Sequence, residues 1–213
     1  MSRPWKRAND EEQKNVRRLE IKSAARELNQ TVPFSRMTLA DIARSASFTR
    51  SNLYKYYSCR EDLFLELMGE DFVDLVEDLE KSLTGRPLNI KELSHIWVDL
   101  ILQHMSLIEL YSLSVPVLEK GAGEEALSRW YEILKEGMVR LNSLILNLFP
   151  HADRYDIDEF LHVQTAQIIG LTPMLKLDER QQAIRKRATM NYSRNYFREI
   201  LCHAVESLLG PWV

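Results

Sequence analysis

The chain has 213 residues, of which 45% are hydrophobic and 28% carry charge. This length permits one large domain or a small domain joined to a larger one, because domains typically hold about 100–150 residues. With only seven glycines and seven prolines, the composition favours packed helices over strands. The two cysteines, Cys59 and Cys202, lie far apart in the sequence, which excludes a disulfide framework and a CxxC metal or redox motif.

Charge is divided unequally along the chain. Residues 1–64 hold 13 Lys and Arg against 8 Asp and Glu, whereas residues 65–213 hold 15 against 23. A basic segment on an acidic body suits a part that contacts DNA joined to a part that does not, since cationic side chains neutralise phosphates. The sequence shows no apolar signal segment and no run of 18 apolar residues, so we expect a cytoplasmic protein that is neither secreted nor membrane-spanning.

The N-terminal third predicts three helices in quick succession. Apolar residues at helical spacing indicate the first, from Asp10 to Gln30. Thr38 can cap a short second helix, with Asp41 accepting amide protons in its first turn, and Thr49 can cap a third that runs to about Tyr57. Only three residues separate the two short helices, so they must cross sharply.

A longer helix should begin near Arg60 and end at Gly85. Further helical patterns cover residues 89–110, 124–149, 156–177 and 191–209, and prolines and glycines separate them. No segment shows the strict alternation of a strand. We therefore predict an all-α protein with an N-terminal three-helix helix-turn-helix domain, residues 1–64, and a larger helical domain, residues 65–213.

The segment from Met37 to Leu65 carries the most specific pattern. Apolar and small residues fall where the two short helices would meet; they are Ile42, Ala43, Ala46, Phe48 and Leu53. The second short helix turns hydrogen-bond donors outward and almost no negative charge; they are Arg50, Ser51, Asn52, Tyr54, Lys55 and Tyr56. Such a face suits the major groove of DNA.

This segment resembles the DNA-binding domain of the TetR family of transcriptional regulators. The resemblance covers about residues 10–65 and keeps the family's spacing without a gap; it rests on Thr38, Ile42, Ala43, Ala46, Thr49, Leu53, Tyr54, Tyr56, Tyr57, Arg60, Glu61, Asp62 and Leu63. Ser47 departs from the pattern, because the family usually has glycine at this turn. A left-handed backbone conformation there would cost a serine about 1 kcal/mol.

Chemistry and resemblance together assign roles on this face. Arg50 can pair with guanine and Asn52 with adenine, while flanking side chains would hold phosphates. The predicted DNA-binding residues are Thr38, Thr49, Arg50, Ser51, Asn52, Tyr54, Lys55, Tyr56 and Arg60. Tyr56 could instead pack in the small domain's core. Basic residues near the N-terminus could follow the minor groove or form a solvated tail; they are Arg3, Lys6 and Arg7.

The resemblance also implies partners: a palindromic DNA operator, a small-molecule effector that releases the repressor, and a second copy of the chain. The dimer would form through the last two long helices, residues 156–177 and 191–209, although an intramolecular core would give the same pattern. The second of these helices offers Tyr192, Tyr196, Phe197, Ile200, Leu201, Val205, Leu208 and Leu209.

The resemblance further implies an effector pocket among the central helices of the larger domain. Large amphipathic side chains there suggest an apolar or aromatic ligand, although such residues also form plain core. The candidates are Trp97, Ile101, His104, Met105, Trp130, Tyr131, Leu134, Met138, Gln164, Thr165 and Ile168.

Two other interpretations stay open. Glu92 and His95, and again Glu159 and His162, show the Glu-x-x-His spacing of di-iron helical bundles, but the first pair shares a polar stripe with Asp99. No nucleophile motif or phosphate loop occurs, so we expect no enzyme activity, metal or cofactor. The second interpretation keeps the DNA-binding domain and makes the protein an activator or a regulator without a ligand.

Overall fold

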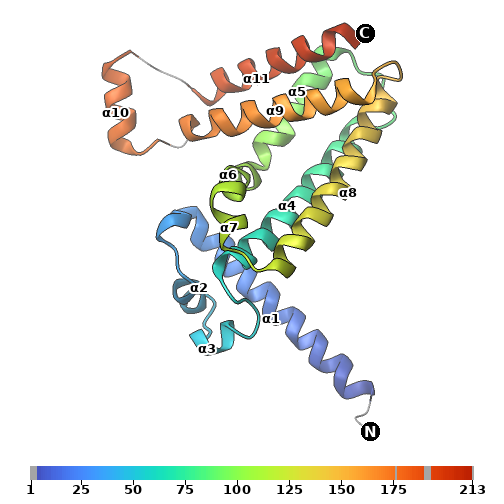
Figure 1. The fold of residues 1–213 in the computed structure, drawn as a ribbon. Helices are drawn as coiled ribbons and strands as arrows, with labels where there is room; N and C mark the ends of the chain where they lie inside the picture. The colour runs from blue at the N-terminus through green and yellow to red at the C-terminus, as the bar shows by residue number, and fades with distance from the viewer. Residues whose placement is uncertain (1–3, 176, 190–192, 213) are drawn as a thin grey trace. The chain divides into compact units, whose positions relative to one another are not determined.

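A computed structural model describes residues 4–175, 177–189 and 193–212, with side chains from residue 11 onward. All regular structure in these ranges is helical, which confirms the all-α prediction (Figure 1). The helices are α1 (Pro4–Thr31), α2 (Leu39–Ser45), α3 (Arg50–Leu53), α4 (Arg60–Leu83), α5 (Ile90–Gln103), α6 (Met105–Leu113), α7 (Glu119–Gly121), α8 (Glu124–Leu148), α9 (Arg154–Leu175), α10 (Glu179–Arg187) and α11 (Arg194–Leu209).

The chain forms two compact units. The N-terminal unit contains Met1–Leu67 and Pro116–Ser128, and the C-terminal unit contains Met68–Val115 and Arg129–Val213. The predicted division after residue 64 stays a prediction. The sequence did not indicate that Pro116–Ser128, from the middle of the chain, groups with the N-terminal helices.

Local hydrogen bonds set the beginnings of the two short helices. Thr38 accepts from the amide of Asp41, whose carboxylate accepts from the amide of Thr38, so the predicted cap of α2 is a complete capping box. Thr49 accepts from the amide of Asn52 and caps α3 as predicted. The regular helix ends at Leu53, earlier than the predicted Tyr57, and tighter turns follow it.

The turn between α2 and α3 places Ser47 in the left-handed conformation, with φ of 59°. The amide of Phe48 donates to the carbonyl of Ala43 at 2.7 Å, and the amide of Ser47 donates to that of Arg44 at 3.2 Å. These two bonds form a Schellman motif, which closes the helix over a residue with positive φ. The expected left-handed serine is therefore present, although glycine suits this conformation better.

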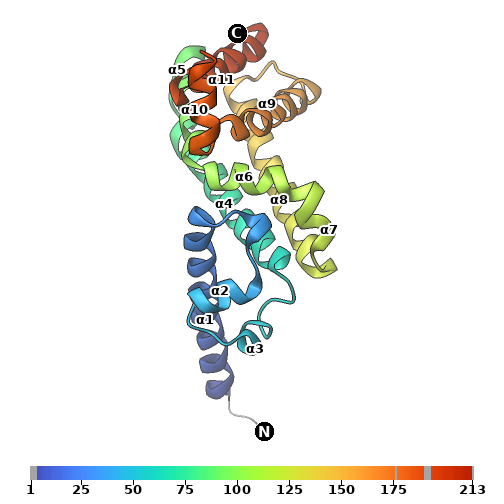
Figure 2. The same ribbon diagram turned by 90° about the vertical axis from the view of Figure 1, so that its left-hand side faces the viewer.

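Helices α1, α2 and α3 pack together in the N-terminal unit (Figure 2), with apolar side chains buried between them. Ile21, Ile42 and Leu53 are each fully buried, as the helix-turn-helix pattern predicted for the last two. Lys22 of α1 forms an ion pair with Glu66 of α4 at 3.2 Å. This core fixes the direction in which α3 points.

In the C-terminal unit, α4 and α8 lie side by side (Figures 1 and 2). Gly137 of α8 allows this approach, because a Cβ atom there would lie 2.2 Å from the ring of Phe72 on α4. A bidentate ion pair between Glu80 and Arg140, at 2.6 and 3.0 Å, joins the same two helices. The contact between them is therefore both close and specific.

A second group of helices in this unit consists of α5, α9 and α11, with α11 packed on both of the others. Arg198 of α11 holds Asp99 of α5 through two hydrogen bonds, at 2.5 and 2.7 Å, which keep the pKa of Asp99 below its usual value. The fully buried Ser94 donates to Glu206 at 2.9 Å.

Two features of the C-terminal unit differ from the prediction. A break at His104, with φ of −91° and ψ of 38°, divides the expected helix over residues 89–110 into α5 and α6. Helix α10 was not predicted: Asp178 caps it, and its side chains are exposed except for the half-buried Arg185. A short polar helix with no buried apolar face gives little periodic signal.

No single helix in the described part of the chain is long and apolar enough to cross a membrane. One bent pair, α5 with Met105–Gly121, meets the criteria of length and composition when its two members are taken together.

Candidate nucleic-acid interface and ligand cavity

Helix α3 and the turn after it expose the donors that the sequence predicted. Arg50, Ser51, Asn52, Tyr54 and Lys55 are all exposed. The guanidinium of Arg50 donates to the hydroxyl of Tyr54 at 3.1 Å, and Lys55 donates to the side-chain oxygen of Asn52 at 3.0 Å. These bonds hold the side chains together on one surface without burying them, so they stay accessible to a partner.

Tyr56 occupies an intermediate position. It is half-buried and packs edge-on against Phe48, with ring centroids 6.4 Å apart. The guanidinium of Arg17 lies over the Phe48 ring, 5.5 Å from its centroid. Tyr56 thus contributes to packing and remains partly accessible, and its phosphate contact stays a prediction.

An open groove of about 400 Å³ brings four predicted DNA-binding residues together. Thr38, at the cap of α2, lines it together with Arg50 and Tyr54. Thr49, the cap of α3, is exposed but does not line this groove. The beginnings of α2 and α3 therefore share one surface, as binding across a single stretch of DNA backbone would require.

Arg60 lines the groove but has partners within the unit. Its guanidinium donates to the carbonyls of Phe34 and Met37 and lies 4.3 Å from the centroid of the Phe34 ring. It also forms an ion pair with Glu61 at 2.9 Å. These contacts give Arg60 a structural role in holding the loop before α2, and its phosphate contact stays a prediction.

The segment Gly121–Gly123 contacts the first turn of α4 within the N-terminal unit. The amide of Gly123 donates to the carboxylate of Asp62 at 2.8 Å, and the thiol of Cys59 lies 3.4 Å from the carbonyl of Gly121. A Cβ atom at Gly121 would come within 2.7 Å of Glu61. Burial raises the pKa of the Cys59 thiol to about 11, so it stays protonated at neutral pH.

The C-terminal unit contains an apolar cavity of about 90 Å³ between α4, α5, α6, α8 and α9. Seven of the eleven predicted ligand-binding residues line it: Trp97, Ile101, Leu134, Met138, Gln164, Thr165 and Ile168. None of the residues that line it, all within the described ranges, carries charge. The helices with the predicted residues thus do enclose a space, and contact with a ligand stays a prediction.

The other four predicted residues lie outside the cavity lining. His104 lies 3.0 Å from the carboxylate of Asp78, Tyr131 is 49% exposed, and Met105 is half-buried. Trp130 packs between the rings of Phe72 and Tyr111. These four residues were predicted from helical spacing alone. That spacing could not show the break at His104, nor which face of α8 would turn toward the cavity.

Several lining residues were missed by the sequence interpretation. They come from α4, from α6 and from neighbouring turns of α8 and α9; they are Phe72, Leu75, Leu79, Leu107, Ile108, Tyr111, Leu141, Leu161 and Ile169. The apolar stripe of α4 was visible in the sequence, but nothing in it indicated which helices it would face.

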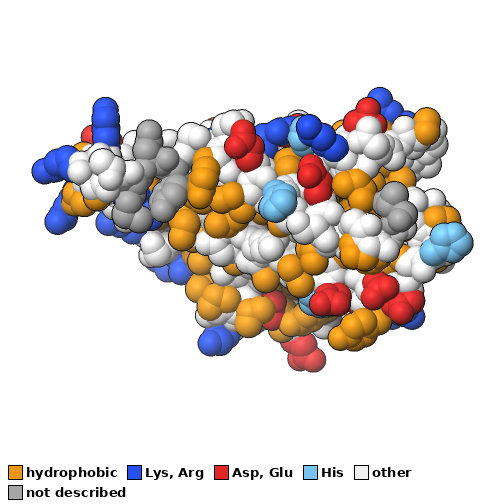
Figure 3. Space-filling view, turned by 90° about the horizontal axis from the view of Figure 1, so that it is seen from above, with side chains coloured by type: hydrophobic (Ala, Val, Ile, Leu, Met, Phe, Trp, Pro, Cys, Tyr) orange, Lys and Arg blue, Asp and Glu red, His pale blue; other side chains and the backbone are white. Residues whose placement is uncertain are grey.

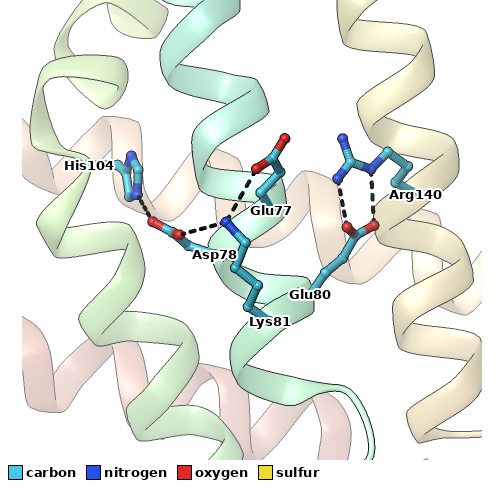
Figure 4. A network of polar contacts seen from close by, with 6 residues as sticks. All are labelled: Glu77, Asp78, Glu80, Lys81, His104 and Arg140. Atoms are coloured by element: carbon cyan, nitrogen blue, oxygen red, sulfur yellow. Dashed lines mark hydrogen bonds and ion pairs between the residues drawn. The ribbon is translucent and has the colours of Figure 1, made fainter.

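Polar contacts between α4 and its neighbours flank the cavity-forming helices. Figure 4 shows Asp78 and Glu80 on α4 reaching His104 and Arg140, while Lys81 pairs with Glu77 on the same helix. The hydrogen bonds from Arg140 lower the pKa of Glu80 below its usual value. These side chains pair with each other, and none of them belongs to the cavity lining.

The Glu-x-x-His pairs do not form a metal site in the described ranges, where no group of three or more His, Cys, Asp and Glu residues could hold an ion. Glu92 accepts from the amide of Asn89 and completes the capping box at the start of α5, while His162 is exposed and contacts the carbonyl of Asp158. Glu92 and His162 thus have local roles within their own helices.

Comparison with protein-family models gives two matches. Residues 21–67 match the model of bacterial regulatory proteins of the tetR family, and residues 69–210 match that of a tetracyclin repressor-like C-terminal domain. The second match alone covers more than half of the chain. The chain belongs to the TetR family. It is accordingly a DNA-binding transcriptional regulator and not an enzyme.

Solved structures of other regulators share the fold at low sequence identity. A regulator assigned to the family from Mesorhizobium loti has a TM-score of 0.66 and 16% identity, with 92% of this chain and 96% of that chain covered. The fatty acid degradation regulator FadR from Bacillus halodurans has a TM-score of 0.60 and 15% identity, with 91% and 95% covered. PfmR from Thermus thermophilus has a TM-score of 0.58 and 12% identity, with 90% and 97% covered. No curated protein matches the chain.

Proposed function

We propose that this TetR-family regulator is a cytoplasmic homodimeric repressor that binds a palindromic operator and is released by a small apolar or aromatic effector. The observation that carries the proposal is the exposed face of α3, where Arg50, Asn52 and Lys55 stand together on a rigid helix-turn-helix core. Arg50 reads guanine and Asn52 reads adenine. The sugar-phosphate backbone of the DNA is bound by the flanking residues, which are Thr38, Thr49, Ser51, Tyr54, Lys55 and Tyr56.

A second copy of the chain is part of this proposal. One helix-turn-helix reads few base pairs, so selectivity requires two half-sites about 34 Å apart. Exposed residues recur at helical spacing along α9, and small ones in the middle permit close approach of another helix; they are Tyr155, Glu159, His162, Ala166 and Gly170. Gly170 has open space at its Cβ position.

Helix α11 adds to this face. Tyr196 is 44% and Ile200 is 37% exposed, whereas four other predicted interface residues are buried in the protomer: Phe197, Leu201, Val205 and Leu209. Those four belong to the intramolecular core; Tyr192 lies outside the described residues, as do the side chains of Arg3, Lys6 and Arg7. Figure 3 shows apolar side chains exposed among charged ones over α9 and α11.

The dimer face is tested by sedimentation of two matched variants. We expect Ile200→Glu to raise the dimer dissociation constant by at least about tenfold, because it places a charge in an apolar contact. Ile184→Glu, at a residue 50% exposed on α10, should leave it unchanged. Equal dissociation constants for both variants and the wild type would place the interface elsewhere.

Chain connectivity suggests how the effector acts. Helix α6 lines the cavity with Leu107 and Ile108 and continues through a π-helical turn, Ser114–Leu118, into the segment that Asp62 holds. A ligand that displaces α6 would move this segment, and with it the first turn of α4. Helix α4 is the next helix after α3 along the chain. It can shift the equilibrium only by its differential affinity for the DNA-bound and free forms.

This coupling has its own test. Asp62→Ala should leave effector binding intact but reduce the release of DNA, because it removes the acceptor for Gly123. Asp74→Ala, an exposed residue on the same helix, serves as the control. Normal release by the Asp62 variant would show that the signal takes another route.

Selection of bound DNA from a random pool tests the reading face. We expect a palindrome whose binding weakens steeply with salt, and loss of that binding in Arg50→Ala combined with Lys55→Ala. The control removes the same charge from exposed residues of α10, Lys186→Ala with Arg187→Ala. Recovery of no preferred sequence would contradict the proposal, and transcription that rises with operator occupancy would identify an activator instead.

A further inference from the structure

The cavity of the C-terminal unit is apolar except at a few buried polar atoms. Gln164 is 2% exposed and lines the cavity, and its amide nitrogen donates to the side-chain oxygen of Gln167 at 3.0 Å. The amide oxygen of Gln164 is buried without a hydrogen-bond partner among the described residues. Since a buried unpaired polar atom is costly, this oxygen has an unmet need for a donor.

Trp97 brings the opposite need to the same cavity. It is 4% exposed and lines the cavity from α5, and its indole N–H is also buried without a partner in the described part of the chain. An indole N–H can only donate. One cavity therefore combines a residue that lacks a donor with a residue that lacks an acceptor.

The rest of the lining limits the charge of any ligand. No Lys, Arg, Asp, Glu or His is among the residues that line the cavity. An ionised carboxylate, phosphate or amine would lose its hydration there and gain no counter-charge, which is strongly unfavourable. A pure hydrocarbon would fit the apolar walls but leave both polar atoms unpaired.

We propose that the effector is a compact, uncharged molecule with an apolar skeleton and one hydroxyl group, which pairs with Gln164 and Trp97. A hydroxyl both donates and accepts, so it can meet both needs at once. A hydroxyl also fits if the side-chain amides of Gln164 and Gln167 are both rotated by 180°, so that oxygen and nitrogen exchange places. It then accepts a hydrogen bond from the amide nitrogen of Gln164. In the unliganded protein a water molecule can make these bonds, and the hydroxyl reproduces them on replacing it.

The size of the cavity supports a compact ligand. At about 90 Å³ it is smaller than the engineered cavity of about 150 Å³ that takes benzene. Leu134 and Met138 of α8 lie in its wall, and the flexible thioether chain of methionine adapts its shape most readily. A molecule with one small ring can thus enter if these side chains shift.

This inference rests on the proposed function, since it names the ligand of the effector cavity. Four probes with one skeleton test it by calorimetry on the full-length protein: benzyl alcohol, benzaldehyde, toluene and benzoate. We expect benzyl alcohol to bind roughly tenfold more tightly than toluene, benzaldehyde to lie between them, and benzoate to bind most weakly. Tighter binding of benzoate or toluene, or no binding of any probe at millimolar concentration, would overturn the inference.

Variants assign the preference to the two residues. Gln164→Leu should reduce the preference for benzyl alcohol over toluene to the level of benzaldehyde while toluene still binds, and Trp97→Phe should abolish the preference for benzaldehyde over toluene. Gln103→Leu makes the same chemical change at an exposed position of α5 outside the cavity lining and should change nothing. An unchanged alcohol preference in Gln164→Leu would also overturn the inference.

The same probes separate this inference from the proposed function. Release of the selected operator DNA by toluene or benzoate, with weak binding of benzyl alcohol, would refute the hydroxyl ligand and leave an effector-responsive repressor. Binding of benzyl alcohol without any release of DNA would uphold the assignment of the cavity and contradict the proposed response.

Discussion

The turn before α3 in the N-terminal unit and the helix pairs of the C-terminal unit are held by contacts of different range in the sequence. In the N-terminal unit, Thr38 meets Asp41 three residues on, and Ser47 and Phe48 close their turn on α2 directly before them. In the C-terminal unit, Glu80 meets Arg140, and Asp99 meets Arg198 almost a hundred residues away. Short-range bonds define the shape of the reading face, while the cavity exists only once distant helices have met.

The strongest test of this contrast is Gly137→Ala. The added methyl group would lie 2.2 Å from the ring of Phe72, so either α4 and α8 must separate or the ring must enter the cavity. We expect the free energy of unfolding in urea to fall by about 3 kcal/mol. Gly210→Ala, where a Cβ meets nothing within 4 Å, is the control. Equal stability of the two variants would show that the contact yields easily.

Arg60→Ala separates structural from DNA-contacting roles in the N-terminal unit. Loss of its bonds to the carbonyls of Phe34 and Met37 should lower the free energy of unfolding by about 2 kcal/mol. Arg50→Ala, at an exposed position, should leave stability unchanged and weaken DNA binding. If Arg60→Ala keeps full stability, Arg60 would return to the set of phosphate contacts alone.

Ser47→Gly tests the local control of the turn. Because Ser47 has φ of 59°, glycine should raise the free energy of unfolding by about 0.5–1 kcal/mol. The same substitution two residues earlier, Ser45→Gly in α2, should lower it by about 0.5–1 kcal/mol, since glycine disfavours a helix. Thermal denaturation of both variants checks the opposite signs, and a shared sign would be inconsistent with a strained turn.

The smallest effect concerns a long-range ion pair. Because Arg140 lowers the pKa of Glu80 in the folded protein, the pair stabilises above the unfolded-state pKa, and that stability is lost as pH falls through the folded-state pKa. Glu80→Gln should cost about 0.5 kcal/mol at pH 7, since both side chains are about a third exposed and solvent screens them. The difference from wild type should vanish once the pH lies below the lowered folded-state pKa of Glu80. Glu132→Gln, at an exposed position of α8, should show no such trend.

These contacts explain how much the sequence could predict. The caps at Thr38 and Thr49, the left-handed Ser47 and the exposed donors of α3 depend on neighbours within five residues, so a pattern reveals them. The predicted ligand-binding residues of α5, α8 and α9 include seven that line the cavity, but the lining residues of α4 were not predicted. Helix pairing is decided by packing across the whole unit, and no local pattern encodes it.

The break at His104 shows the same limit. The sequence there continues an apolar helical pattern, and the side chain of Asp78 on another helix meets the imidazole where the backbone leaves the helix. Helix α10 was missed for the opposite reason, since it has no apolar stripe at all. In both places the helix boundaries are set by polar contacts and caps, which the spacing of apolar residues does not reveal.

The protonated state of the two thiols has a practical consequence for labelling. Thiolates, not thiols, react with maleimides, and burial raises the pKa of both Cys59 and Cys202. A new cysteine at the exposed Ser51 would therefore react first at neutral pH, with both native cysteines left in place. A fluorophore attached there would sit on the face of α3 and report directly on its occupancy.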